Sequence, residues 1–398
     1  MISSAEAFAL VLAAAPDYGV EEVDLLDACG RVLRQPICAD REHPPFDRVS
    51  MDGIAISQSD WSRGQRRFPI TGCQAAGMAP LSLEPASCLE AMTGAVLPKG
   101  ADGVIPVEHL RRDGDAAILP DDYAFEAGMN IHRRGSDHAR GAELLAAGIV
   151  LNPPRLALAA TCGRRKLQVA RLPEAAVIAT GDELVDPDSE PLPWQIRRSN
   201  SFAITAGLRG LGIKASEHHL PDKEQELEER LGVLLLSKQL IVLSGGVSAG
   251  KFDLIPATLK RLGCEVIFHQ VSQRPGKPLL FARKGQTLIY GLPGNPVSAL
   301  VNFTRFVLPQ VRRSLGLPSS QSLVLLAEEL IFKKPLTLYQ PVRLIADSEG
   351  RQRAFPLRGN GSGDHGSLAL TDGFVELAAE TSVFPAGSIV PYFPWSPL

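Results

Sequence analysis

The sequence predicts a multidomain protein of the α/β plus β class, in which a central, mostly parallel α/β sheet is joined to smaller β domains. Three observations support this prediction. From about Ala175 to Val311, short apolar runs alternate with helical patterns, which is typical of a parallel sheet covered on both faces. Residues 54–126 contain short strand patterns separated by glycine, proline and aspartate. The same short-strand pattern returns after about Leu317.

The positions of these patterns divide the chain into four predicted domains. A length of 398 residues is enough for two to four domains of ordinary size. We expect a helical and extended linking domain from residues 1–46 and 127–172, and a small β-sandwich or barrel at 47–126. The α/β domain covers 173–317, and a C-terminal β-barrel-like domain covers 318–398.

Two helices outside the α/β region carry boundary signals. Ser3 followed by Glu6 has the pattern of a capping box, in which the serine side chain satisfies a free N–H of the first turn. For the second helix, Asn152 is a suitable cap, Pro153 suits the first turn, and Gly163 suits the C-terminal stop. We therefore expect helices after Ser3 and after Asn152.

Composition excludes several classes of protein. The net charge is −3, so no overall positive field indicates nucleic-acid binding. No apolar run reaches the ~20 residues needed to cross a bilayer, and the alanine-rich start lacks the positive segment of a signal peptide. The 6 cysteines are sparse and none forms a C-x-x-C pair, so we interpret them as reduced core thiols. These features predict a cytoplasmic protein with no membrane partner.

Three glycine-containing loops follow predicted strands of the α/β domain, at Thr180–Val185, Ser244–Gly250 and Gly291–Ala299. Ligands of open α/β sheets bind at the carboxyl ends of strands, and glycine lets backbone N–H groups approach an anion. A single glycine loop between a strand and a helix is usually just a turn, whereas three such loops with polar side chains in one domain are stronger evidence. Together they supply a set of candidate ligand-binding residues: Gly181, Ser244, Gly245, Gly246, Ser248, Pro293, Gly294 and Asn295.

Acidic residues accompany these loops. Asp182 and Glu183 lie in the first loop, and Asp253 follows the second. Hard oxygen ligands of this kind hold Mg²⁺, which bridges to phosphate oxygens. Asp222 precedes a predicted helix at 223–236 and is interpreted as its cap; capping is also the structural alternative for Asp253. We predict Asp182, Glu183 and Asp253 as metal ligands.

Two cations in the segment "RPGKP", Arg274 and Lys277, are displayed by a proline-glycine turn. Arginine binds an oxyanion at two points and lysine acts as a point charge. The alternative is an exposed basic turn. The sequence contains no G-x-G-x-x-G, P-loop or H-E-x-x-H motif. His218 and His219 would point to opposite sides of a strand, so we interpret them as structural residues and not as ligands of one metal. Acids and cations together predict a site for a metal-bridged anion.

The order of these motifs resembles the molybdopterin molybdenumtransferase family, which comprises the bacterial MoeA proteins and the matching domains of plant Cnx and animal gephyrin. The matching segments are "PPFDRVSMDGIA", "MTGAVLP", "RRGSD", "TGDEL", "SGGVSAGKFD", "RPGKP" and "GLPGNPVSA", between positions 44 and 299. The resemblance implies a molybdopterin-binding type of α/β domain in an elongated homodimer of four-domain subunits. It also implies that the protein inserts molybdenum from molybdate into adenylylated molybdopterin, with release of AMP and participation of Mg²⁺.

Site residues are implied by the same resemblance. The functional residues of the three N-terminal motifs fall on Asp52, Thr93 and Asp137, and those of the α/β domain on Glu183, Asp182, Asp222 and Asp253. The molybdate-binding residues fall on Arg274, Lys277, Pro278 and Ser298. The site of the family lies between the α/β domain of one subunit and the small β domain of the other. Molybdopterin adenylyltransferase and downstream molybdenum enzymes are the implied protein partners.

The sequence departs from the family pattern at several positions. Ile54 stands where many members have tyrosine, and Gln270 stands where many have a lysine four residues before Arg274. The arginine and serine contacts of the last domain have only candidates here: Arg343, Ser362 and Ser367. Two other functions fit the residues: a Mg²⁺-dependent nucleotide pyrophosphatase, which would not need the two cations, and a non-catalytic cofactor-binding scaffold.

Overall fold

The computed structural model describes residues 1–247, 254–318 and 321–396, which form two compact units. Unit 1 comprises Met1–Glu22, Gly30–Val32 and Gln168–Leu398, and unit 2 comprises Val23–Cys29 and Leu33–Leu167. The division falls within β2 (Val20–Asp24) and β13 (Lys166–Ala170). The predicted site residues are therefore distributed over two units.

The central sheet of unit 1 is the predicted, mostly parallel α/β sheet. Its six strands are β14 (Ala175–Thr180), β17 (Ala215–Leu220), β18 (Leu240–Ser244), β19 (Glu265–His269), β21 (Leu280–Lys284) and β22 (Thr287–Leu292), in the order β17-β14-β18-β22-β21-β19. The first four of this order run parallel, whereas β21 pairs antiparallel with both β22 and β19. The expected α/β fold is confirmed.

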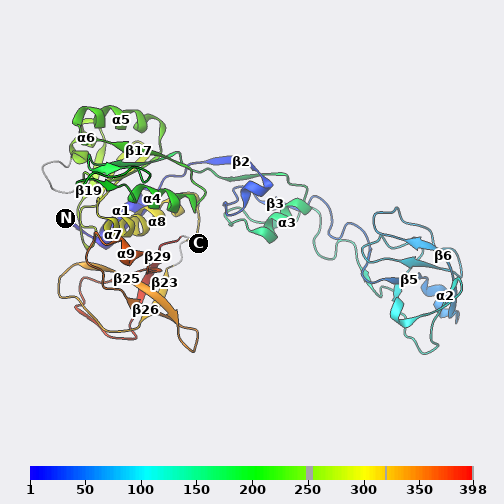
Figure 1. The fold of residues 1–398 in the computed structure, drawn as a ribbon. Coiled ribbons are helices and arrows are strands. Elements are labelled where there is room, and N and C mark those ends of the chain that lie inside the picture. Colours follow the sequence, from blue (N-terminus) through cyan, green and yellow to red (C-terminus); the bar gives the residue numbers. More distant parts are fainter. Residues whose placement is uncertain (248–253, 319–320, 397–398) are drawn as a thin grey trace. The chain divides into compact units, whose positions relative to one another are not determined.

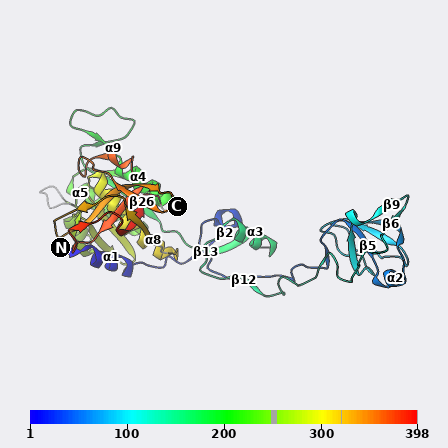
Figure 2. The ribbon, with the colours of Figure 1, turned by 90° about the horizontal axis from the view of Figure 1, so that it is seen from below.

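Helices cover both faces of this sheet (Figure 1). One face carries α1 (Ser4–Ala13), α4 (Asn200–Arg209), α7 (Pro296–Asn302), the π-helical turn η3 (Phe303–Val307) and α8 (Leu308–Leu315). The other face carries α5 (Glu224–Ser237) and α6 (Ile255–Arg261). The view in Figure 2 shows α1 on the same side of unit 1 as α8, against which it packs.

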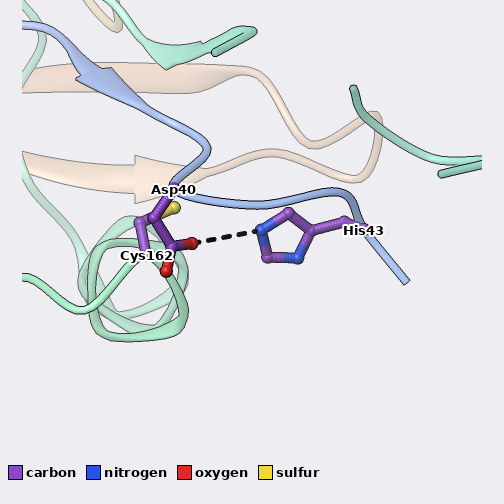
Figure 3. Close-up of side chains that lie close together, drawn as sticks. All are labelled: Asp40, His43 and Cys162. Atoms are coloured by element: carbon purple, nitrogen blue, oxygen red, sulfur yellow. Dashed lines mark ion pairs between the residues drawn. The ribbon is translucent and has the colours of Figure 1, made fainter. Parts of the chain in front are cut away.

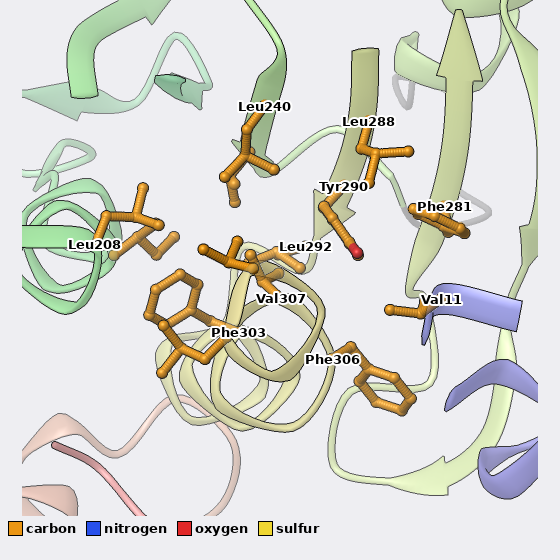
Figure 4. Packing of buried hydrophobic residues seen from close by; sticks show 14 of the residues in the cluster. Val11, Leu208, Leu240, Phe281, Leu288, Tyr290, Leu292, Phe303, Phe306 and Val307 are labelled. Carbon is orange, nitrogen blue, oxygen red and sulfur yellow. The ribbon is translucent and has the colours of Figure 1, made fainter. Parts of the chain in front are cut away.

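Successive side chains of β14 point to opposite faces of the sheet, and each face has its own hydrophobic core. Val177 points into a cluster that includes Phe303 and Tyr290, whereas Ile178 points into a second cluster with Leu231. Figure 4 shows the first cluster, in which Phe303 and Phe306 of η3 pack on the face of the sheet that carries residues of β18 and β22. Because every residue of β14 is buried, the strand reads as a continuous apolar run instead of an alternating one.

Most helix boundaries agree with the sequence signals. Ser3 Oγ accepts the Glu6 N–H at 3.1 Å, and Asn152 accepts the Arg155 N–H at the start of α3 (Pro153–Thr161). The interpretation of Asp222 was wrong, because the residue at the cap of α5 is Lys223. The backbone N–H of Asp222 instead bonds to the side chain of Asp182, so this turn is shaped by the first loop of the site.

The C-terminal part of unit 1 is a closed barrel, as predicted. Its strands are β23 (Ser322–Leu326), β25 (Thr337–Ala346), β26 (Gln352–Pro356), β27 (Gly373–Leu377) and β29 (Ile389–Pro394), and β25 pairs with both β26 and β27 to close the ring. β1 (Ile2–Ser3) and β20 (Val271–Arg274) extend the sheet from β25. β24 (Leu330–Ile331), β28 (Val383–Phe384) and α9 (His365–Leu368) complete it. Because β20 leads into the "RPGKP" turn, the barrel supports the two predicted cations.

Unit 2 contains a six-stranded sheet in the order β8-β5-β7-β6-β10-β9, where β5 is Gly53–Ile56, β6 Arg67–Gln74, β7 Cys88–Ala91, β8 Gly103–Pro106, β9 Arg111–Asp113 and β10 Ala116–Ile118. Ile54, one of the departures noted in the sequence, is buried in its core. The rest of the unit has α2 (Gln58–Ser62), α3 and the short pairs β3 (Ile37–Cys38) with β12 (Glu143–Leu145) and β4 (Arg48–Val49) with β11 (Ile131–His132).

The remaining short elements are β15 (Leu184–Val185), β16 (Ile196–Arg197), and the 3-10 turns η1 (Leu25–Ala28) and η2 (Val107–His109). In the described ranges, no helix combines the length and apolarity that crossing a membrane requires. All 6 cysteines are free thiols, but the prediction of core thiols was wrong for Cys29 and Cys73, which are exposed.

Candidate functional site

A cavity of about 690 Å³ opens at the carboxyl ends of β14, β18 and β22. It forms there because the three parallel strands end at one edge of the sheet, so their loops converge. Many of the predicted loop residues line it: Gly181, Glu183, Asp222, Ser244, Gly245, Gly246, Pro278, Pro293, Gly294 and Asn295. The predicted residues Ser248 and Asp253 lie outside the described residues.

Glycine is required at the base of this cavity. Gly245 has φ +102°, and a Cβ atom there would lie 2.6 Å from the Thr180 carbonyl oxygen. A side chain would therefore be strained and would push the β14 and β18 loops apart. The absence of side chains at Gly245 and Gly246 leaves room for a ligand to approach the backbone closely, while the Gly245 N–H itself donates to the Leu292 carbonyl at 3.0 Å.

Asn200, at the start of α4, bonds to the loops after β18 and β22. The sequence analysis did not predict it as a site residue. Its Nδ2 donates to Ser244 Oγ at 2.8 Å and to the Gly294 carbonyl at 2.8 Å. Its Oδ1 is buried and has no hydrogen-bond partner among the described residues. A buried acceptor without a donor costs about 1–3 kcal/mol, so the contact between the two loops is kept at a local cost in stability.

The two adjacent acids of the first loop have different surroundings. Glu183 lines the cavity, whereas Asp182 does not line it and instead accepts the Asp222 N–H at 3.1 Å. His219 Nε2 donates to the Gly181 carbonyl at 2.9 Å and so holds the same loop. The structural interpretation of this histidine agrees with the contact. Glu183 and Asp222 are the described carboxylates that reach the cavity wall.

A second cavity, of about 590 Å³, adjoins the first and contains the predicted cations. Arg274, Lys277, Pro278 and Ser298 all line it. Pro278, Pro293 and Asn295 line both cavities, so a single extended ligand or two neighbouring ligands can occupy them together.

The turn that carries the cations is built on buried amides. Gln273 Nε2 donates to Asn302 Oδ1 at 2.6 Å, and Asn302 Nδ2 donates to the Gly276 carbonyl at 3.0 Å. Gly276 has φ +86°, and a Cβ atom there would lie 2.7 Å from Asn302 Nδ2. These contacts fix the backbone between Arg274 and Lys277, so the two charges are held in place before any ligand binds.

The barrel contributes a third cation to this cavity, which sequence reasoning missed. Arg358 lines it together with Ser362 and Ser367, whereas the candidate Arg343 and the substituted Gln270 do not. Asn295 Nδ2 donates to Ser362 Oγ at 3.0 Å and joins the barrel loop to the α/β domain. Within the described ranges, none of Arg274, Lys277 and Arg358 forms an ion pair. The cavity is therefore an electropositive pocket suited to a polyvalent anion.

Asp52 and Thr93 of unit 2 are in direct contact. Asp52 Oδ1 accepts both the backbone N–H and the hydroxyl of Thr93, each at 2.6 Å. The side-chain and backbone hydrogen bonds from Thr93 hold the pKa of the Asp52 carboxyl below its usual value. The resemblance thus assigned functional roles to two residues that form one hydrogen-bonded pair.

Asp137 belongs to a separate chain of hydrogen-bonded side chains in unit 2. Arg48 Nη2 lies 3.0 Å from His132 Nδ1, and His132 Nε2 lies 2.7 Å from Asp137 Oδ1. Because arginine can only donate, Nδ1 accepts and Nε2 carries the proton that is donated to Asp137. This hydrogen bond from His132 lowers the pKa of Asp137. The residue is thereby held ionised and oriented.

Replacing Thr93 by valine is expected to raise the pKa of Asp52. The substitution keeps the shape and the backbone N–H but removes the hydroxyl donor, so the carboxylate loses stabilisation relative to its protonated form. Titration of the Asp52 carboxyl carbon by NMR checks this, with Thr161→Val, on α3, as a control. An Asp52 titration that does not move would show that the hydroxyl contact has no role in solution.

Three family models match successive parts of the chain. The MoeA N-terminal region (domain I and II) matches residues 2–163, a probable molybdopterin binding domain matches 176–313, and the MoeA C-terminal region (domain IV) matches 324–395. A molybdopterin molybdenumtransferase of Synechocystis sp. is 36% identical over 99% of this chain and 100% of its own length. The chain belongs to the molybdopterin molybdenumtransferase family.

Other relatives of this family support the assignment. A molybdopterin molybdenumtransferase of Bacillus subtilis is 32% identical over 93% of this chain and 88% of its own length. The crystal structure of a molybdopterin biosynthesis MoeA protein from Pyrococcus horikoshii superposes with a TM-score of 0.84 at 28% identity, covering 100% of both chains. The family therefore extends over all parts of the chain, including the barrel that supplies Arg358.

Proposed function

We propose that this protein inserts molybdenum from molybdate into adenylylated molybdopterin and releases AMP. The observation that carries the proposal is the pair of adjoining cavities. One contains carboxylates and glycine loops, and the other contains three cations that have no acidic partner among the described residues. The two cavities share three lining residues. Such an arrangement can hold a phosphorylated organic substrate beside a separate oxyanion. The membership of the family supports the same reaction.

The first cavity is proposed to bind the adenylylated molybdopterin. The side-chain-free turn at Gly245 and Gly246 lets its phosphates approach the backbone closely. The carboxylates of Glu183 and Asp222 are hard oxygen donors, so the residues fit Mg²⁺. They would hold the ion with Asp182 and Asp253 as further proposed ligands, and the ion would neutralise pyrophosphate charge.

The second cavity is proposed to bind molybdate. Molybdate is a tetrahedral dianion, and Arg274, Lys277 and Arg358 bring three positive charges to one pocket. Ser298 and Ser362 add hydroxyl groups that can donate to its remaining oxygens, whereas the Ser367 hydroxyl already donates to the Asp364 carbonyl at 3.1 Å. Tungstate has the same charge and shape, so these residues are expected to accept it as well.

We further propose a homodimer in which Asp52, Thr93 and Asp137 of one subunit complete the site of the other. The carboxylates of Asp52 and Asp137, held in place by hydrogen bonds from Thr93 and His132, would add to the acidic groups of the α/β cavity across the dimer. The same proposal places the protein in the cytoplasm. It also includes delivery of the substrate by molybdopterin adenylyltransferase and transfer of the product to molybdenum enzymes.

The reaction can be tested with the purified protein, adenylylated molybdopterin, Mg²⁺ and molybdate. AMP release and the activation of a cofactor-free molybdenum enzyme are both expected to require molybdate. Chelation of Mg²⁺ is expected to slow AMP release because the pyrophosphate loses its counterion. AMP release at the same rate without molybdate would instead identify a nucleotide pyrophosphatase, and binding without AMP release would identify a scaffold.

A further inference from the structure

We propose that Asp40, His43 and Cys162 of unit 2 form a binding site for a zinc-class divalent ion. One ligand atom of each residue lies within 4.8 Å of the other two. Figure 3 shows the Asp40 carboxylate facing the imidazole ring of His43, with Cys162 beside Asp40. The site shares no residue with the α/β cavities and does not depend on the proposed reaction.

The donor set determines the class of metal. A thiolate, an imidazole and a carboxylate are the three side-chain ligands that Zn²⁺ combines, whereas Mg²⁺ and Ca²⁺ select oxygen ligands only. Three protein ligands leave a fourth tetrahedral position for water. The same ligands accept Co²⁺, which serves as a spectroscopic probe.

The environment of His43 indicates a missing partner. Its side chain is 13% exposed, and its Nε2 atom is buried without a hydrogen bond to any described residue. Asp40 Oδ1 is 3.9 Å from this nitrogen, which is too far for a hydrogen bond. A buried imidazole nitrogen that is left unpaired is costly, and a metal bond would satisfy it.

The backbone holds two of the ligands in position. The His43 N–H donates to the His138 carbonyl at 2.9 Å, and the His43 carbonyl accepts the Asp137 N–H at 2.9 Å. Cys162 is 4% exposed at the C-terminal end of α3, where its N–H bonds to the Leu158 carbonyl. Cys162 is too buried to serve as a nucleophile toward a substrate, so the rival interpretation as a Cys-His catalytic pair fails.

The geometry allows an ion with small side-chain movements. Tetrahedral bond lengths place ligand atoms about 3.4–3.6 Å apart, so separations of up to 4.8 Å must shorten by roughly 1 Å. The Asp40 side chain is 49% exposed and free to rotate, and its exposure also provides the path by which an ion enters. Because His43 is bonded to Asp137 and His138, the ion would brace the loop that carries the proposed functional residue Asp137.

The experiment uses the full chain, freed of metal with a chelator and kept reduced, and titrated with Co²⁺. One equivalent is expected to produce the near-ultraviolet charge-transfer band of a thiolate–Co²⁺ bond, and Zn²⁺ is expected to abolish the band by displacement. Co²⁺ held by the oxygen ligands of the α/β cavity gives no such band, so the outcome is independent of the proposed Mg²⁺ site.

Variants assign the band to the three residues. Cys162→Ser is expected to abolish it, and Asp40→Asn, which changes an exposed side chain without altering its shape, is expected to weaken binding at least about 100-fold. The double variant Cys29→Ser, Cys73→Ser removes the two exposed thiols and is expected to keep the band. Zn²⁺ should also raise the unfolding temperature of the wild type but not of Cys162→Ser.

Three results would overturn the proposal. They are the absence of a charge-transfer band in the wild type, a band that persists in Cys162→Ser, and a band that disappears in the Cys29, Cys73 double variant. Circular dichroism of each metal-free variant establishes that it is folded. If Cys162→Ser is unfolded, Asp40→Asn alone decides, because unchanged Co²⁺ affinity in that variant excludes the site.

Discussion

Removing both turn cations, by Arg274→Ala with Lys277→Ala, is expected to raise the molybdate concentration for half-maximal turnover roughly 100-fold. A hydrogen bond to a charged group contributes about 1.5–3 kcal/mol, and exposure of both side chains in the free protein favours the lower value. Two such losses amount to about 3 kcal/mol. Affinity for adenylylated molybdopterin should change much less. Steady-state kinetics with molybdate as the varied substrate, and calorimetry with the organic substrate, measure the two effects.

A matched control is available in the same domain. Arg283→Ala with Lys284→Ala removes the same two residue types from β21, where Arg283 pairs with Glu265 and neither residue lines a cavity. The net charge changes equally, so any effect of the overall field on anion binding is reproduced without loss of direct contacts. Equal losses in both double variants, or equal losses of molybdate and organic substrate binding, would contradict the assigned roles.

Local patterns in the sequence were sufficient to predict the α/β domain and much of its cavity. A parallel strand buried on both faces produces an apolar run such as Ala175–Thr180, and the loop that follows it must lie at the ligand-binding edge. Gly245 and Gly276 belong to glycine-containing turns that are visible in the sequence, and the structure gives both a positive φ. These signals are local, so they can be recognised in the sequence.

The features that were missed depend on contacts between distant segments. Arg358 follows β26 in the barrel and reaches the oxyanion cavity because the barrel packs beside Ser298, which no local pattern encodes. Asn200 looks like an ordinary helix start until Ser244 and Gly294 are placed beside it. The capping role expected of Asp222 was wrong because α5 begins later than expected, with Lys223 at its cap. Cys162 and His43 meet through tertiary structure alone.

The second large effect concerns dimers that combine different inactive subunits. Asp52→Ala and Glu183→Gln are each expected to lower turnover at least about 100-fold, because each removes a carboxylate of the proposed site. If Asp52 completes the site of the partner subunit, a heterodimer of these variants has one site with both defects and one intact site. Purified heterodimers should then show about half the activity of wild-type dimers. Differently tagged subunits, co-expressed and isolated by two affinity steps, provide the sample.

A second pair of variants separates complementation from simple stabilisation. Asp52→Ala combined with Asp137→Asn places both defects in residues of unit 2, which are proposed to serve the same site from the same subunit. Each site of that heterodimer then retains one defect, so no activity should return. A shared site predicts recovery in the Asp52–Glu183 pair and no recovery in the Asp52–Asp137 pair. Subunits that each work alone would not produce this combination of results. Two inactive heterodimers would show that Asp52 acts within its own subunit, and the proposed assembly would have to be abandoned.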